Sequence, residues 1–114
     1  MGMGKLFYGT SEQVVEVDDM LLAHVQKVII TKLRRGESFP LTWKTATGGR
    51  ETLWVHASLL LRFVLGCDEA SERTDAQLLR HLADGANSHH GMDLTDDAVR
   101  RLSRPARPVL RAAA

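Results

Sequence analysis

The sequence has few of the residues and runs that supply covalent cross-links or membrane anchorage. Cys67 is the single cysteine, so no internal disulfide can form and stability has to come from packing. No apolar run approaches the roughly 18 to 20 residues that span a bilayer, and the N-terminus has no signal-peptide core. We therefore expect a soluble cytoplasmic protein without a membrane partner.

The sequence also has little net charge. The formal net charge is +1, which gives the whole chain no strong attraction to nucleic acid or to an anionic membrane. The charges are nevertheless unevenly placed, because residues 12–19 carry acidic side chains and no basic one, whereas from Arg100 onward the chain carries arginines and no acid. Any electrostatic binding should therefore come from local clusters.

The overall composition predicts one packed domain. Hydrophobic residues make up 44% of the 114 residues and charged residues 25%, which is typical of a globular chain and not of a disordered one. A chain of this length is sufficient for a single core. We predict one α+β domain over residues 1–102, followed by a flexible tail rich in Arg, Pro and Ala over residues 103–114.

Apolar spacing in the first third predicts two strands and a helix. The runs at residues 5–8 and 14–17 read as short strands around a turn. A helix is expected over residues 19–35, because Leu22, Val25, Ile29 and Leu33 follow a 3-4-4 spacing. Asp18 or Asp19 would cap its start, and Gly36 is placed to end it in a left-handed conformation.

From residue 39 the spacing changes to a period of two, which predicts a meander of strands. Residues 39–44 and 52–57 should form a hairpin around Gly48 and Gly49, with residues 59–65 as the third strand of the meander. Pro40 cannot donate a ladder hydrogen bond. The strand that contains Pro40 should therefore lie at an edge, or should have its outward N–H side free at that point.

The last third predicts a second helix and a brief return to the sheet. A helix capped by Thr74 or Asp75 carries the apolar stripe of residues 78–86, residues 92–94 form a short strand, and residues 95–97 cap a final turn or two. The fold class is therefore α+β, with a small, mainly antiparallel sheet in ββαβββα order and one long helix packed on it. The predicted core consists of Leu22, Val25, Ile29, Leu33, Phe39, Leu41, Trp43, Leu53, Val55, Leu82 and Ala86.

No residue constellation indicates an enzyme. None of the lysines lies in the Lys-x-Asp-Gly motif of nucleotidyl transferases, and no Gly-x-Ser-x-Gly elbow is present. The histidines and Cys67 do not follow a metal-binding spacing such as His-x-x-x-His or Cys-x-x-Cys. We expect no catalytic residues, no metal and no cofactor.

Basic residues are the candidates for a binding surface, through contacts to nucleic-acid phosphates. His24, Lys27, Thr31 and Arg34 share a polar helix face, which is either a phosphate-contacting face or an ordinary solvated one. Trp54 is either a base-stacking side chain or part of the core. The candidate nucleic-acid-binding residues are Lys27, Lys32, Arg34, Arg35, Arg50, Arg62, Arg104 and Arg107.

A run of eight residues carries a family resemblance. Residues 32–39 read Lys-Leu-Arg-Arg-Gly-Glu-Ser-Phe, and Tyr8-Gly9, Leu53-Trp54-Val55-His56 and Ala86-Asn87-Ser88 occur in matching order. The chain resembles a family of short actinobacterial proteins of uncharacterised function that are commonly labelled ATP-dependent DNA ligase. The resemblance implies a ligase-associated module and not a ligase, since the lysine motif is missing, and it transfers no catalytic residue.

Two functional hypotheses follow. The first is a non-catalytic accessory module associated with DNA ligation or nucleic acid, whose partner is DNA or a DNA-processing protein. The second is a protein–protein interaction or self-assembling domain without nucleic-acid binding, which would include a homo-oligomer. The edge strand expected around Pro40 and the near-neutral charge motivate the second hypothesis.

Overall fold

The protein has an α+β fold of six strands and three helices over the described residues. The structure is a computed structural model that describes residues 2–10, 13–66 and 73–103. The predicted tail lies outside these residues from Arg104 onward, as does Cys67. The elements are β1 (Met3–Tyr8), β2 (Gln13–Asp18), α1 (Asp19–Arg34), β3 (Phe39–Lys44), β4 (Arg50–Val55), β5 (Leu61–Val64), α2 (Ala76–Asn87), β6 (Met92–Asp93) and α3 (Asp97–Ser103).

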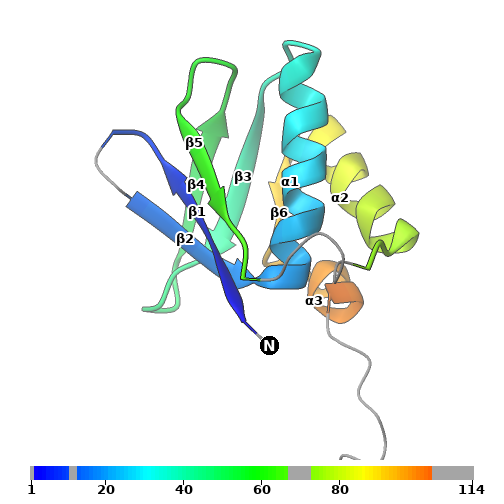
Figure 1. Ribbon diagram of the computed structural model, residues 1–114. Coiled ribbons are helices and arrows are strands. Elements are labelled where there is room, and N and C mark those ends of the chain that lie inside the picture. The colour runs from blue at the N-terminus through cyan, green and yellow to red at the C-terminus, as the bar shows by residue number, and fades with distance from the viewer. Residues whose placement is uncertain (1, 11–12, 67–72, 104–114) are drawn as a thin grey trace, which may run out of the picture.

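The strands form two three-stranded sheets (Figure 1). Sheet A has the order β2-β1-β5 and is antiparallel throughout. Sheet B has the order β4-β3-β6, in which β3 and β4 are antiparallel and the short β6 runs parallel to β3. The predicted α+β class and mainly antiparallel pairing are confirmed, but the strands divide between two sheets.

The third strand of the predicted meander pairs elsewhere. β5 does not continue sheet B beside β4; it lies antiparallel to β1, with Leu61 opposite Tyr8 and Val64 opposite Lys5. A physical reason is that Leu6 of β1 is fully buried, so the backbone on both sides of β1 needs a hydrogen-bonding neighbour. β2 supplies one neighbour and β5 the other.

Pro40 lies in the central strand of sheet B, so its expected place at a sheet edge is wrong. The other alternative agrees with the structure, because the pairing of β3 with β6 begins only at Leu41. Beside Pro40 the neighbouring chain is Gly91, which approaches so closely that no hydrogen-bonding strand fits there. Proline in a central strand is tolerated at a point where the ladder is interrupted.

Helix α1 begins and ends as its sequence predicts. The Asp18 carboxylate accepts hydrogen bonds from the N–H groups of Met20 and Leu21, at 3.0 and 3.3 Å. At the other end Gly36 has φ of 72°, and its N–H donates to Leu33 O while the Glu37 N–H donates to Lys32 O. This pair of bonds is a Schellman motif, which satisfies the last carbonyl groups of the helix.

The core surrounds α1, which packs on sheet A and on α2, while α2 packs on β3 and β6 of sheet B. The predicted core residues are all buried except Leu33 and Leu53, which are partly buried against the same cluster. The two sheets meet where the ring of Tyr8 contacts the ring of Trp43 edge-on, with centroids 5.8 Å apart.

In the described part of the chain, no helix is both long and apolar enough to cross a lipid bilayer.

Gly91 is required for the close approach of the α2–β6 turn to β3. Its φ is 81°, and a Cβ at this position would overlap the carbonyl oxygen and the ring of Pro40. Gly48, in the β3–β4 turn, also has a positive φ, of 95°, but a Cβ there would meet nothing within 4 Å. Substitution of Gly48 by alanine therefore adds only backbone strain, whereas substitution of Gly91 adds backbone strain and steric overlap.

We predict that Gly91→Ala lowers the free energy of unfolding by about 2 kcal/mol or more, from overlap added to left-handed strain. Gly48→Ala should cost only about 1 kcal/mol, from the strain alone. Urea unfolding of the two variants and the parent measures both values. Equal losses in the two variants would show that Gly91 does not approach Pro40 as described.

Candidate docking groove

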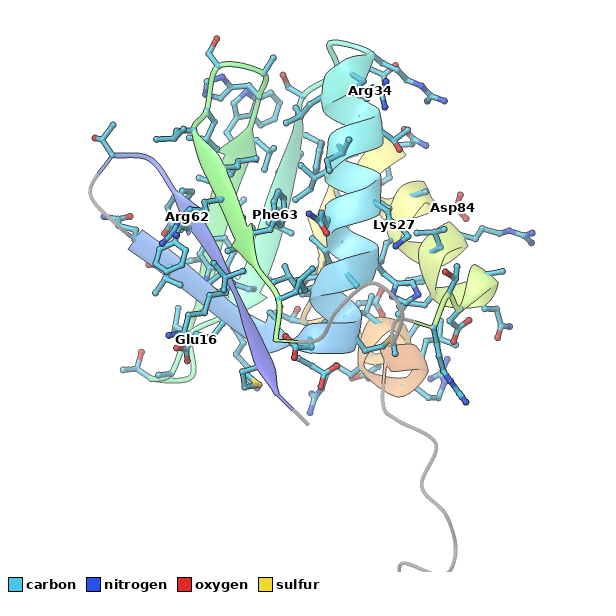
Figure 2. The ribbon with its side chains drawn as sticks, viewed as in Figure 1. Glu16, Lys27, Arg34, Arg62, Phe63 and Asp84 are labelled. Carbon is cyan, nitrogen blue, oxygen red and sulfur yellow. The ribbon has the colours of Figure 1, made fainter. Side chains whose placement is uncertain are left out.

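An open apolar groove runs between α1 and β5. Its volume is about 450 Å³, within the range of 300–1,000 Å³ that is common for ligand-binding hollows. Figure 2 shows Phe63 on the side of β5 that faces α1, and Arg34 at the C-terminal end of the helix. The groove is lined by Ile29, Ile30, Leu33 and Arg34 of α1 and by Ala57, Leu59, Leu60, Leu61 and Phe63 from β5 and the segment before it.

The start of α1 is joined to the chain just after β5. The Gly66 N–H, just after β5, donates to Oδ1 of Asp19, the first residue of α1, at 3.0 Å. A Cβ on Gly66 would lie 2.7 Å from Oδ2 of Asp19, so a larger residue would push the Asp19 carboxylate aside. From this junction β5 and α1 separate toward the C-terminal end of the helix (Figure 1).

The other end of α1 is anchored on the opposite side, away from β5. The Lys32 side chain is only 9% exposed, and its ammonium donates to Asn87 Oδ1 of α2 at 2.7 Å and pairs with Glu37 Oε1 at 3.0 Å. The hydrogen bond from Lys32 lowers the pKa of Glu37. Moving α1 toward β5 to close the groove would pull the buried Lys32 ammonium away from Asn87, which would cost the hydrogen bond that joins α1 to α2.

The groove leaves large apolar side chains in contact with solvent. Ile30 is 42% exposed and Leu60 is 63% exposed, although the neighbouring Ile29 is fully buried. Sequence reasoning did not identify this surface. The sequence did contain a signal, namely apolar residues that do not fit the expected period. Ile30 lies outside the apolar stripe of its helix. Leu59, Leu60 and Leu61 are consecutive, although a half-buried strand would place only alternate residues inward.

The predicted basic residues fall on several elements and do not form one cluster. Arg34 and Arg35 lie together, exposed, at the end of α1, and Lys27 is exposed on the same helix. Arg50 lies on sheet B, and Arg62 lies on sheet A with its guanidinium 4.4 Å from the centroid of the Phe7 ring. Lys32 is buried, as described above, and Arg104 and Arg107 lie outside the described residues. Their role in nucleic-acid binding stays a prediction.

His24 does not belong to the exposed helix face on which it was expected. It is buried, and its two ring nitrogens are occupied: Nδ1 lies 2.7 Å from the Met20 carbonyl oxygen and Nε2 accepts from the Asp75 N–H at 2.9 Å. These two bonds require a neutral ring that carries its proton on Nδ1. His24 thus joins α1 to the residue that caps α2.

A family model described as a domain of unknown function (DUF7882) matches residues 3–97. The chain belongs to this family. The matched span includes both sheets, α1 and α2, and therefore every residue that lines the groove. No curated protein and no solved structure matches this DUF7882 chain.

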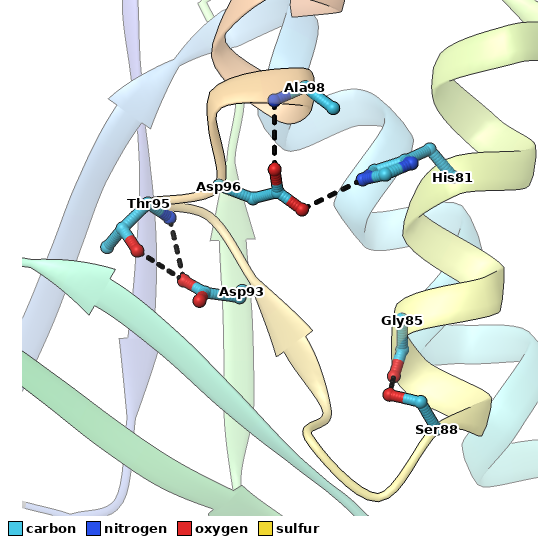
Figure 3. A network of polar contacts seen from close by, with 7 residues as sticks. All are labelled: His81, Gly85, Ser88, Asp93, Thr95, Asp96 and Ala98. Atoms are coloured by element: carbon cyan, nitrogen blue, oxygen red, sulfur yellow. Dashed lines mark hydrogen bonds and ion pairs between the residues drawn. The ribbon is translucent and has the colours of Figure 1, made fainter.

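A second hollow of the DUF7882 domain, of about 320 Å³, is lined by several polar residues and lies between α2 and the segment around β6. His81 Nε2 lies 3.1 Å from Asp96 Oδ2, whereas the Ser88 hydroxyl donates to the Gly85 carbonyl at 2.8 Å and not to the histidine (Figure 3). Within the described ranges, no group of three or more His, Cys, Asp or Glu side chains is placed to hold a metal ion. The contacts of this hollow serve to fix α3 to α2.

Asp96 makes the contacts that join α2 to the start of α3. Its Oδ1 accepts the Ala98 N–H at 2.9 Å, which caps α3, and this bond together with the one to His81 lowers the pKa of Asp96. A carboxylate whose pKa is lower in the folded state contributes stability above the unfolded pKa. That contribution is lost as the pH falls through the lowered folded value.

We predict that Asp96→Asn, which keeps a capping side chain but removes the charge, destabilises the domain by about 0.5 kcal/mol at neutral pH. The difference from the parent should shrink as the pH falls from the unfolded pKa of the carboxyl through its lowered folded pKa, because the parent carboxyl then becomes protonated as well. Urea midpoints across this pH range measure it. A difference that persisted unchanged at acid pH would mean that the Asp96 charge contributes nothing.

Proposed function

We propose that this domain is a non-catalytic protein-interaction module that docks an extended segment of another protein in the groove between α1 and β5. The observation that carries the proposal is the exposed apolar lining of that groove, represented by Ile30 and Leu60, beside the edge strand β5. Contiguous exposed apolar surface with a polar rim is typical of protein interaction sites.

The anchoring of α1 supports a binding role, because it keeps the groove open. Asp19 fixes the helix to the residue after β5, and Lys32 fixes it to α2. A groove that is open before its ligand arrives avoids part of the ordering cost of binding. A partner would bury Ile30 and Leu60, which removes apolar area from water, and could pair its charge with Arg34 at the rim.

The test is a display library of random peptides, selected on the immobilised parent domain. Peptides that dock in the groove should lose about tenfold or more in affinity on Ile30→Glu, because a carboxylate would be placed against apolar side chains. Fluorescence polarisation of labelled peptides measures the affinities, and circular dichroism confirms that the variants fold.

Val14→Glu is the matched control. Val14 is 40% exposed, close to the 42% of Ile30, but it lies on β2 at the opposite edge of sheet A. Binding should be retained in this variant. A library that yields no binder, or binders that tolerate Ile30→Glu as well as Val14→Glu, would refute docking in the groove.

One observation favours a second candidate, a nucleic-acid-associated module linked to DNA ligation, as the resemblance to ligase-labelled proteins implies. Trp54 is 59% exposed on β4, and the period of two places Arg50 on the same face of that strand. An exposed aromatic side chain on a sheet can stack on an unpaired base, while nearby cations contact phosphates.

For this candidate we predict weak, sequence-tolerant binding of single-stranded DNA. The logarithm of the binding constant should fall with log salt at a slope of about −3 to −5, for about four to six phosphate contacts. Trp54→Ala should lower the affinity by about 1 kcal/mol or more. Titration of labelled oligonucleotides measures both, and the absence of binding at low salt would eliminate this candidate.

A further inference from the structure

We infer that the partner binds by adding an antiparallel strand to β5, and that this strand alternates apolar residues facing α1 with acidic residues facing away. The inference rests on the proposed docking function of the groove and specifies what occupies it. Three features of the described residues carry it: the direction of the β5 backbone groups, the uncovered edge of β5 and the sign of the charges beside it.

The hydrogen bond between Gly9 and Leu60 fixes the direction of the β5 backbone. The Gly9 N–H donates to the Leu60 carbonyl at 3.0 Å, in register with Tyr8 opposite Leu61. In an antiparallel pair successive residues turn their N–H and C=O groups alternately toward and away from the neighbour. Leu60, Arg62 and Val64 therefore face β1, so that Leu61 and Phe63 turn their backbone groups outward.

The outward groups of Leu61 and Phe63 lie along the groove. β5 pairs only with β1 among the described strands, so these two N–H and two C=O groups have no strand partner there. A strand added about 4.8 Å from β5 would enter the space between β5 and α1. The side chains directly opposite Leu61 and Phe63 would then face Ile30 and Leu33 of the groove.

The edge of β5 is not protected by its own arginine. Proteins commonly block an exposed edge with a charged side chain, and Arg62 is the charged residue of β5. The guanidinium of Arg62, however, lies over the ring of Phe7 in β1. The side chain therefore points toward the neighbouring strand β1 and not across the open edge of β5 (Figure 2). An extended peptide can therefore approach Leu61 and Phe63 without displacing the Arg62 side chain.

The charges beside the edge favour an acidic strand. The charged side chains here are those of Arg34 in the groove and Arg62 in β5, and no acidic side chain of the described residues is within ion-pair distance of either. An acidic residue opposite Arg62 would form a favourable cross-strand pair. The β5 strand of a second copy is a poorer occupant, because pairing Arg62 with Arg62 would place like charges opposite each other. The chain's own residues 104–114 are also a poorer occupant, because their charged side chains are all basic.

The test uses short peptides of alternating valine and glutamate, and matched peptides of valine and lysine, with fluorescence polarisation as the readout. The glutamate peptide should bind the parent about 1.4- to fivefold more tightly, because a cross-strand charge pair contributes about 0.2–1 kcal/mol. Arg62→Glu should reverse this preference. Arg50→Glu, a change of an exposed strand arginine on sheet B, should leave it unchanged.

Backbone pairing is tested by N-methylation of the glutamate peptide. In antiparallel addition the valines face inward and donate their N–H groups to β5, so methylation of the valine nitrogens should weaken binding about two- to tenfold for each hydrogen bond lost. Methylation of the glutamate nitrogens should have little effect. Equal effects at both positions, or an effect at glutamate alone, would overturn antiparallel strand addition.

The outcomes distinguish this inference from the function on which it rests. If library-selected peptides depend on Ile30 but the glutamate peptide does not bind, docking in the groove stands and strand addition fails. If no binder of either kind depends on Ile30, both fail. Sedimentation equilibrium of the parent measures whether the domain self-associates. A dimer that dissociates on Ile30→Glu would show that a second copy occupies the groove, and would overturn the inference.

Discussion

The anchoring of α1 at both ends is the constraint on which the rest of the structure depends. Asp19 holds the start of the helix against Gly66, after β5, and Lys32 holds its end against Asn87 of α2. Lys32 has a buried ammonium, and such a group is costly unless its partners are in place, so its position is strongly determined. The helix is therefore fixed to the residue after β5 at its beginning and to α2 at its end, and the groove lies between its C-terminal half and β5.

A second constraint, the burial of β1, explains why the outer edge of β5 has no strand neighbour among the described residues. Leu6 of β1 is buried, and β1 needs a strand on each side, which draws β5 out of the expected meander and makes it the outer strand of sheet A. In this position Phe63 packs inward while its backbone groups point outward along α1. A strand edge beside an apolar helix face is the geometry in which domains add an extended peptide to a sheet, with main-chain bonds for affinity and side-chain contacts for specificity.

Much of the fold could be predicted from local signals. The 3-4-4 spacing from Leu22 to Leu33, the cap at Asp18 and the glycine at position 36 gave the bounds of α1, since each acts within a few residues. The partner of β5 could not be predicted, because alternation identifies a strand but not its neighbour. The buried roles of His24 and Lys32 were also missed, since each depends on a contact with a residue more than 50 positions away. The groove was missed for a related reason: Ile30 and Leu60 become informative only when their exposure is known.

Native-state amide hydrogen exchange along β5, in the monomeric protein without any partner, tests the open edge most directly. We expect rapid exchange for the N–H groups of Leu61 and Phe63, which face the groove, and slow exchange for those of Arg62 and Val64, which face β1. Protection of Leu61 and Phe63 equal to that of Arg62 and Val64 would contradict the account, because it would mean that the edge of β5 is already covered.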